Sequence, residues 1–347
     1  MKNDLSCAVV RDLLPSYIDG LTAPETNNAV EAHLRGCPDC ARLHRQMAAP
    51  EDPPRQETDR EVDYLKQVRR KSRLRVALAV LVTAALLIGG LAVKIFLIGA
   101  PADASAMVWE VTQTDTGIRV QVMSAASANA YWGWKLTQEG NVLTITCREG
   151  LVSPFHPDAS GDVDVTLSPG ITEVRLGSKV IWQEGTAIDR RVLAAWNART
   201  PYVGDMPALN ELANALDIQG LCGDYTNALH TSDRPYGWTL DFLDYGWNQK
   251  DAVLRDREME RLSLLMLALV DNLDEVSWTW KEADGPVGQQ TEQRRTVTLA
   301  EADAALAELY KDANAAGGTD WTAPGSVKDC AESPAALQRL WTAAGVR

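Results

Sequence analysis

The stretch VALAVLVTAALLIGGLAVKIFLI, residues 76–98, decides how this chain is organised. Its only charged residue is Lys94, close to the distal end, where the lysine stem can reach lipid headgroups. About 20 consecutive apolar residues suffice for a helix to cross the hydrocarbon core of a bilayer. A helix buried on all sides in a soluble domain is the alternative. The run predicts a single transmembrane helix over residues 76–98.

The residues before this run carry a cluster of positive charge. Residues 66–75 hold six Lys and Arg side chains and no acidic residue. Basic flanks mark the cytoplasmic end of a transmembrane helix, which places residues 1–75 in the cytoplasm and residues 100–347 outside. A cleavable signal peptide would not follow 75 mostly polar residues. We therefore expect a single-pass protein of the cell membrane, in contact with the lipid bilayer, with a cytoplasmic N-terminus and an extracellular C-terminus.

The net charge of −13 is shared unequally between the two sides of this helix. Residues 1–75 hold 13 basic and 12 acidic residues, whereas the segment beyond residue 98 holds 20 and 35. A general nucleic-acid-binding protein shows an overall basic footprint, so we expect no direct nucleic-acid partner. The apolar content of 46% excludes a disordered chain.

Residues 1–47 predict a small all-α module of three short helices. Apolar residues recur at helical spacing over residues 7–19. The sequence Thr22-Ala-Pro-Glu25 has the pattern of a capping box for a second helix that ends at Gly36. A third helix is expected from about Ala41. So short a segment buries too few side chains to rely on its core alone, which makes a bound metal physically reasonable.

Four side chains of this module are the candidate metal ligands: Cys7, His33, Cys37 and Cys40. His33 and Cys37 are four residues apart, so a helix and its end present both on one face. Cys37 and Cys40 form a C-x-x-C pair, whose turn lets two thiolates bind one tetrahedral ion. Cys7 supplies the fourth ligand if the first helix packs on the second. Three Cys and one His form a closed structural zinc site.

Two further interpretations of these residues stay open. His44 is an alternative to His33, although it follows the C-x-x-C turn. Oxidation of the thiols to a disulfide would eject the metal and make the site a redox switch as well. A lasting disulfide is disfavoured because the cytoplasm is reducing.

The stretches CAVVRDLLPSYIDG, residues 7–20, and VEAHLRGCPDC, residues 30–40, resemble the zinc-finger module of bacterial anti-sigma factors. The resemblance covers about residues 3–46 and includes all four metal positions. It implies a helical domain that binds an extracytoplasmic-function sigma factor. In that family, binding hides the surfaces with which the sigma factor engages core polymerase and promoter DNA.

Residues 48–75 are expected to form a hinge and a basic juxtamembrane helix. Three prolines within residues 47–56 predict the hinge. The helix, residues 59–75, carries Val62, Leu65 and Val68 on one face. The family resemblance implies a helix here, and the alternative is a basic stalk steadied by anionic lipid.

Beyond the membrane helix, residues 106–184 predict a β-rich domain. Short alternating runs are separated by turn signals such as Ser168-Pro-Gly170, which suggests a small antiparallel sandwich. The seven strands are expected near residues 108–112, 118–122, 130–136, 142–147, 163–167, 172–176 and 179–182.

Residues 189–347 predict an α+β domain. Its longest helix, over residues 251–271, contains an apolar run at residues 262–270. That run is too short for a second span and is flanked by acids, so we expect it to be buried in the core. The other helices are expected at 189–199, 206–216, from Ala300 and from Ser333, and strands near 225–229, 238–243, 276–280 and 296–299.

Part of this region, about residues 195–310, resembles a domain of unknown function. The resemblance rests on TPYVGD at residues 200–205, PYGWTL at 235–240 and LALVDNLDEV at 267–276. That domain recurs in the outer parts of membrane-anchored proteins of Gram-positive bacteria. The resemblance implies that this region lies outside the membrane, and it assigns no catalytic activity to the region.

No catalytic set stands out in the outer part, so we expect no enzyme activity. His156 and His230 are single histidines without a motif that pairs either one with a nucleophile. The outer part contains three cysteines, Cys147, Cys222 and Cys330, so at least one stays unpaired within it. The favoured disulfide is Cys222–Cys330. The alternating tryptophans Trp132, Trp134, Trp278 and Trp280 are core residues or line a groove for a glycan or peptide.

The sequence thus predicts a multi-domain, membrane-bound anti-sigma factor that holds an extracytoplasmic-function sigma factor and releases it on an envelope signal. We expect release to follow cleavage by membrane proteases. One alternative is a membrane adaptor whose zinc module holds a different cytoplasmic protein. The other is a membrane-anchored envelope binding protein or enzyme in which the zinc module is regulatory and not specific for a sigma factor.

Overall fold

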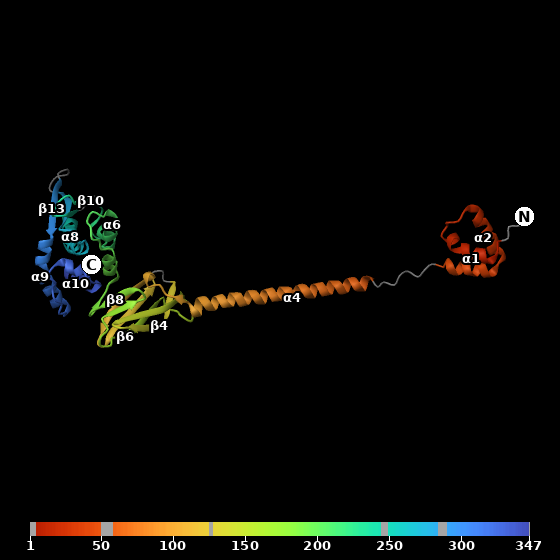
Figure 1. The fold of residues 1–347 in the computed structure, drawn as a ribbon, viewed down its shortest axis with the longest axis horizontal. Coiled ribbons are helices and arrows are strands. Elements are labelled where there is room, and N and C mark those ends of the chain that lie inside the picture. The colour runs from red at the N-terminus through yellow and green to blue at the C-terminus, as the bar shows by residue number, and fades with distance from the viewer. Residues whose placement is uncertain (1–4, 50–57, 125–127, 244–248, 284–289, 347) are drawn as a thin grey trace. The chain divides into compact units, whose positions relative to one another are not determined.

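The computed structural model describes residues 5–49, 58–124, 128–243, 249–283 and 290–346. It divides into two compact units, Met1–Ala84 and Ala85–Arg347. Figure 1 shows a small helical module, a long helix, a sheet-rich part and a mixed α/β part in chain order. This order is the one that the sequence predicts.

The first unit begins with three short helices, α1 (Cys7–Ile18), α2 (Pro24–Gly36) and α3 (Pro38–Met47). Helix α3 starts three residues earlier than expected, because Pro38 occupies its first position, where a missing N–H costs nothing. The predicted capping box of α2 is wrong. Ala23 is the N-cap and makes no side-chain cap, while the Thr22 hydroxyl donates to Asn27 instead.

The core of this module is small. Only four of its described residues are buried apolar side chains: Val10, Leu14, Val30 and Cys40. Other apolar side chains pack around them while staying half-exposed, among them Leu13. A core of this size supports the expectation that the helices need a further stabilising link.

The predicted juxtamembrane helix and the predicted membrane span are one element. Helix α4 (Thr58–Val93) runs without a break into a π-helical turn, η1 (Lys94–Ile98), because residues 58–88 contain neither Gly nor Pro. The part Val68–Ile98 has a mean hydropathy of 2.7 over its best window, none of which is buried. It is therefore long and apolar enough to cross a membrane. Most of the expected hinge, residues 50–57, lies outside the described residues.

The sheet-rich part contains all seven predicted strands and two short extra ones, β1 and β9. Strands β2, β3 and β6 form one sheet, and the other six form a second sheet that packs on it. The expectation of a purely antiparallel sandwich is wrong, because β7 pairs parallel to β5 after the chain has crossed through β6 of the other sheet. The bounds are β1 (Ala100–Pro101), β2 (Met107–Thr114), β3 (Gly117–Ser124), β4 (Asn129–Glu139), β5 (Val142–Leu151), β6 (Ser160–Thr166), β7 (Glu173–Leu176), β8 (Lys179–Gln183) and β9 (Thr186–Ala187).

The mixed part is built on a four-stranded sheet of β10 (Tyr225–His230), β11 (Gly237–Phe242), β12 (Glu275–Ala283) and β13 (Gln290–Thr298). Helix α8 (Gln249–Leu269) connects β11 to β12, which therefore run parallel. The apolar run of α8 is buried in the core as predicted. The remaining elements are α5 (Arg190–Asn197), α6 (Met206–Ala215), α7 (Ile218–Cys222), α9 (Leu299–Gly317), the 3₁₀ turn η3 (Val327–Ala331) and α10 (Pro334–Ala344).

Two helix starts of this part are confirmed by their caps. Thr298 and Glu301 form a reciprocal capping box at the start of α9. The Ser333 side chain accepts from the backbone N–H of Ala336 at the start of α10. Each side chain satisfies a backbone donor that the helix itself leaves unpaired.

The predicted Cys222–Cys330 disulfide is wrong. Cys147, Cys222 and Cys330 are all free and buried, and the sulfur of Cys330 lies 3.7 Å from the Tyr310 hydroxyl oxygen. Burial raises the pKa of Cys147 and of Cys222 to about 12, and that of Cys330 to about 11. These thiols are therefore protonated and behave as small apolar core residues.

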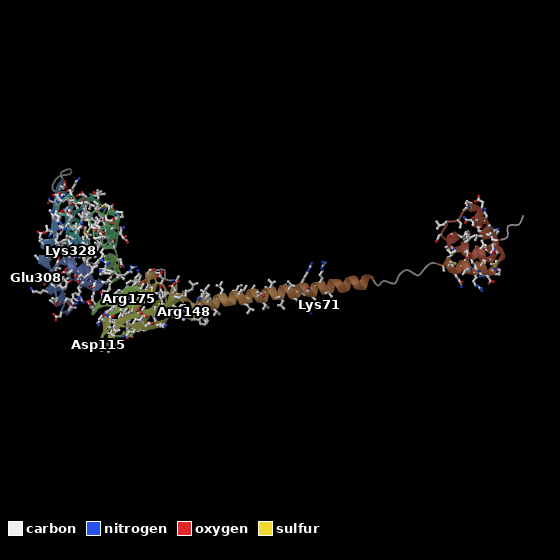
Figure 2. The ribbon with its side chains drawn as sticks, in the orientation of Figure 1. Lys71, Asp115, Arg148, Arg175, Glu308 and Lys328 are labelled. Atoms are coloured by element: carbon white, nitrogen blue, oxygen red, sulfur yellow. The ribbon has the colours of Figure 1, made fainter. Side chains whose placement is uncertain are left out.

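Lys328 of η3, labelled in Figure 2, closes the C-terminal end of α8. Its Nζ donates to the carbonyl oxygens of Val270, at 2.5 Å, and Leu273, at 2.9 Å. Burial lowers the pKa of Lys328 to about 8, although nearby aspartates oppose that shift.

Replacing Lys328 with methionine is expected to destabilise the second unit by about 1–3 kcal/mol, since two carbonyl groups then lose their donor. Lys311→Met is the matched control, because the pair of Lys311 with Glu308 is fully exposed and its loss should leave the unfolding midpoint nearly unchanged. Chemical unfolding of the full chain in detergent measures both. Equal midpoints for the two variants would contradict this role of Lys328.

Candidate metal centre

The four predicted ligands lie at helix ends that converge. Cys7 is the first residue of α1, His33 lies in the last turn of α2, and Cys40 lies in the first turn of α3. Cys37 belongs to both neighbouring helices as the C-cap of α2 and the N-cap of α3. Its extended backbone turns the chain, so that the helix before it and the helix after it each contribute one further ligand.

The side chains of these four residues are close enough to share one ion. Their ligand atoms all lie within 4.8 Å of one another. The sulfurs of Cys7 and Cys37 are 3.8 Å apart. Two thiolates bound to one tetrahedral zinc at 2.3 Å lie about 3.8 Å apart, so this pair already has the separation that such an ion requires.

His33 presents a nitrogen that nothing else in the described chain uses. Its Nε2 is buried and has no hydrogen-bond partner among the described residues. A buried nitrogen without a partner is costly, and coordination of a metal would satisfy it. The cluster therefore fits a metal ion by an observation that is independent of the cysteine spacing.

The two sulfurs of the C-x-x-C pair have different pKa values. The pKa of Cys37 is lowered to about 7, first because the backbone N–H of Cys40 donates to its sulfur. Burial and the neighbouring thiols raise the pKa of Cys40. The N-terminus of α3 thus favours a thiolate at Cys37, and a cation would favour thiolates at all three cysteines.

His44, the alternative ligand, lies elsewhere. It belongs to the last turn of α3, and its ring lies 5.7 Å from the ring of Tyr17. It is not a member of the four-residue cluster. The structure thus brings together His33 with the three cysteines and leaves His44 out. That these four residues bind zinc stays a prediction.

Among the described residues, neither single histidine of the second unit stands in a cluster of this kind. The ring of His156 stacks on Trp132, with centroids 3.8 Å apart and planes 7° from parallel. The ring of His230 lies 3.5 Å from the Asp233 carboxylate in an exposed pair. The candidate tryptophan groove is also divided, because Trp132 and Trp134 lie on β4, whereas Trp278 and Trp280 lie on β12 of another sheet.

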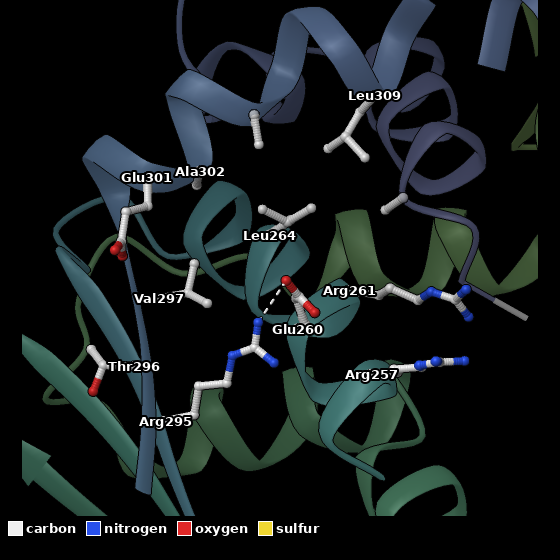
Figure 3. A pocket seen from close by; sticks show the side chains of 12 residues that line it. Arg257, Glu260, Arg261, Leu264, Arg295, Thr296, Val297, Glu301, Ala302 and Leu309 are labelled. Carbon is white, nitrogen blue, oxygen red and sulfur yellow. Dashed lines mark hydrogen bonds and ion pairs between the residues drawn. The ribbon is translucent and has the colours of Figure 1, made fainter. Parts of the chain in front are cut away.

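The second unit also has a pocket of about 700 Å³ between α8, β13 and α9, shown in Figure 3. Arginine side chains reach it, but Arg295 is paired with Asp256, at 2.7 Å, and with Glu260, at 2.8 Å. Arg261 is likewise paired with Glu258 at 2.8 Å. These guanidinium groups already have anionic partners within the fold.

Two parts of the chain match known protein families. Residues 7–41 match the family described as "Putative zinc-finger". Residues 196–294 match the family described as "Domain of unknown function (DUF4825)". Both resemblances predicted from the sequence are confirmed. No solved structure matches the chain.

The N-terminal module is also similar to a regulator of Bacillus subtilis (strain 168), the anti-sigma-YlaC factor YlaD. The two chains are 41% identical over 46 residues. The matched stretch is 13% of this chain and 47% of the relative, so the chain spans about half the length of that relative. The N-terminal module is therefore a homologue of a zinc-finger segment of an anti-sigma factor, joined here to a membrane-spanning candidate helix and a DUF4825 domain.

Proposed function

We propose that this protein is a membrane-bound anti-sigma factor that sequesters an extracytoplasmic-function sigma factor. The observation that carries the proposal is the cluster of Cys7, His33, Cys37 and Cys40 within a module homologous to an anti-sigma factor. The role is regulatory, and we assign no catalytic residue.

Zinc is the metal that this donor set fits best. Three thiolates and one imidazole form a tetrahedral site with no position left for a reacting water, as in structural zinc sites. The bound ion would supply charge neutralisation and a fixed link between helices. The chain's own contribution is to hold α1, α2 and α3 together at the ends where the ligands lie, which fixes the surface offered to the sigma factor.

The module has apolar side chains left over for a partner. Val9, Leu21 and Met47 are exposed although the module buries so few apolar residues in its own core. We propose that the sigma factor covers these side chains when it binds the module.

We propose that the module faces the cytoplasm and the second unit faces outwards. Exposed basic side chains precede the apolar part of α4, which favours this orientation: Arg69, Arg70, Lys71, Arg73 and Arg75. A sigma factor acts in the cytoplasm, so the same orientation is needed for sequestration. The outer unit would then receive the envelope signal, and release would follow cleavage by membrane proteases.

The proposal predicts capture of a host sigma factor by the full chain. The zinc-loaded chain, solubilised in detergent and mixed with each extracytoplasmic-function sigma factor of its host, is expected to retain one of them on affinity beads. A chain that lacks residues 1–49 is the control and should retain none. If the zinc-loaded full chain retains no sigma factor, the proposed function is wrong.

A further inference from the structure

The end of the long helix is fixed to the sheet-rich part of the second unit by direct contacts. The Arg148 side chain, labelled in Figure 2, donates from Nε to the carbonyl oxygen of Ile98 at 2.7 Å. Strand β1 follows at once and pairs with β5. Gly150 of β5 permits this approach, because a Cβ there would lie 2.5 Å from the carbonyl oxygen of Ile95.

A tight turn after β5 lies beside this helix end. The backbones of Ser153 and His156 exchange two hydrogen bonds, at 2.9 and 3.0 Å, which leaves Pro154 and Phe155 at the tip. The stacking of His156 on Trp132 fixes one side of the turn to β4. On its other side, the backbone N–H of Val152 donates to the carbonyl oxygen of Ala128 at 3.0 Å, so the turn is held at both ends while its tip stays exposed.

The tip of the turn and the helix end form one apolar groove. From the helix it is lined by Val93, Phe96 and Leu97, and from the turn by Val152, Pro154 and Phe155. Phe155 is 65% exposed, which is a large exposed area for a phenylalanine held in a rigid turn. An apolar patch of this kind marks a surface that is covered in the working protein.

The position of the groove along the helix identifies what covers it. Val93, Phe96 and Leu97 belong to the part of the helix that is long and apolar enough to cross a membrane. Val93 lies about one helical turn further into the apolar segment than Ile98. A turn that lies beside these residues is at the depth of the acyl chains. The exposed charges of Lys94 and Arg148 mark the level of the headgroups, which long basic side chains reach from nearby.

We propose that the turn at residues 152–155 inserts into the leaflet next to the second unit, with Phe155 among the acyl chains and a lipid chain in the groove. The inference rests on the membrane span of the proposed function. A lipid is the occupant because the groove continues the apolar surface of the spanning helix. A protein partner would have to lie within the bilayer to reach it.

Labelling by photoactivatable phosphatidylcholine with a diazirine in the acyl chain tests this proposal. The full chain is placed in vesicles that contain this lipid, irradiated and digested with trypsin. We expect labelled peptides from the spanning helix and from the peptide that contains Phe155, and none from the peptide that contains Tyr202. Tyr202 is the matched control because it is also 65% exposed and lies in the same unit.

The variants Phe155→Ser and Tyr202→Ser sharpen the test. Phe155→Ser is expected to lose the label on the turn and to keep the label on the spanning helix, whereas Tyr202→Ser changes neither. A labelled helix with an unlabelled turn overturns the inference and leaves the proposed function intact. Equal labelling of the Tyr202 peptide also overturns it. If the helix itself is unlabelled, both the inference and the proposed membrane span are wrong.

Discussion

Replacing Cys40 with serine is expected to remove the metal from the N-terminal module and to unfold its three helices. Cys40 is buried and supplies both a candidate ligand atom and one of the four buried apolar side chains of the module. Structural zinc contributes about 10–16 kcal/mol of apparent binding free energy to folds of this size, which far exceeds what so small a core can supply. Zinc per chain, from elemental analysis, and hydrogen exchange over residues 5–49 measure the two effects.

Two matched comparisons separate loss of a ligand from loss of a side chain. Cys330→Ser changes an equally buried cysteine outside the cluster and should leave zinc content unchanged. His33→Ala should lose the zinc, whereas His44→Ala should keep it, because only His33 belongs to the cluster. A Cys40→Ser chain that binds one zinc with normal hydrogen exchange would show that the ligand set is wrong.

The second large effect is expected from Trp278→Ala in the second unit. Trp278 is fully buried on β12, where it pairs with Leu240 of β11 and Arg295 of β13. Its removal leaves a cavity at the centre of the sheet, and large-to-small changes of this kind cost about 3–5 kcal/mol. Chemical unfolding of the second unit should show this loss, and zinc content should not change, because the candidate metal ligands belong to the other compact unit.

Trp278→Phe separates packing from hydrogen bonding at the same position. The Trp278 indole donates from Nε1 to Asp256 at 3.0 Å, and phenylalanine cannot replace that bond. Its loss should cost about 1 kcal/mol, beyond a smaller packing loss than alanine causes. Similar unfolding midpoints for the two variants would mean that packing of the indole contributes little.

The proximity of the metal-ligand candidates could be predicted from the sequence because most of the geometry is local. His33, Cys37 and Cys40 lie within eight residues, and one helix end followed by a turn places them together. Cys7 required that α1 pack on α2, which the apolar spacing of both helices predicts. The spacing of His33, Cys37 and Cys40 therefore predicted the structure better than the capping pattern at Thr22 did. At Thr22 the helix begins one residue later than expected, and no side chain caps it.

Features that join distant parts of the chain were not predictable in this way. The parallel pairing of β5 with β7 depends on the path of the chain through β6. The residue pattern of an individual strand does not reveal which strand becomes its neighbour. The Cys222–Cys330 pairing failed because two cysteines in one domain need a specific separation and orientation, which no spacing reveals. The helix-end contacts of Arg148 and Gly150 involve residues about fifty positions beyond the helix, so no local pattern announces them.

The junction at Ile98 has a mechanical meaning. A flexible connection would let the sheet-rich part turn independently of the helix, but here β1, Arg148 and Gly150 tie the helix end to the sheet. A rotation of the sheet-rich part is therefore expected to turn residues 85–98 with it. The proposed lipid contact would lie at this same fixed junction.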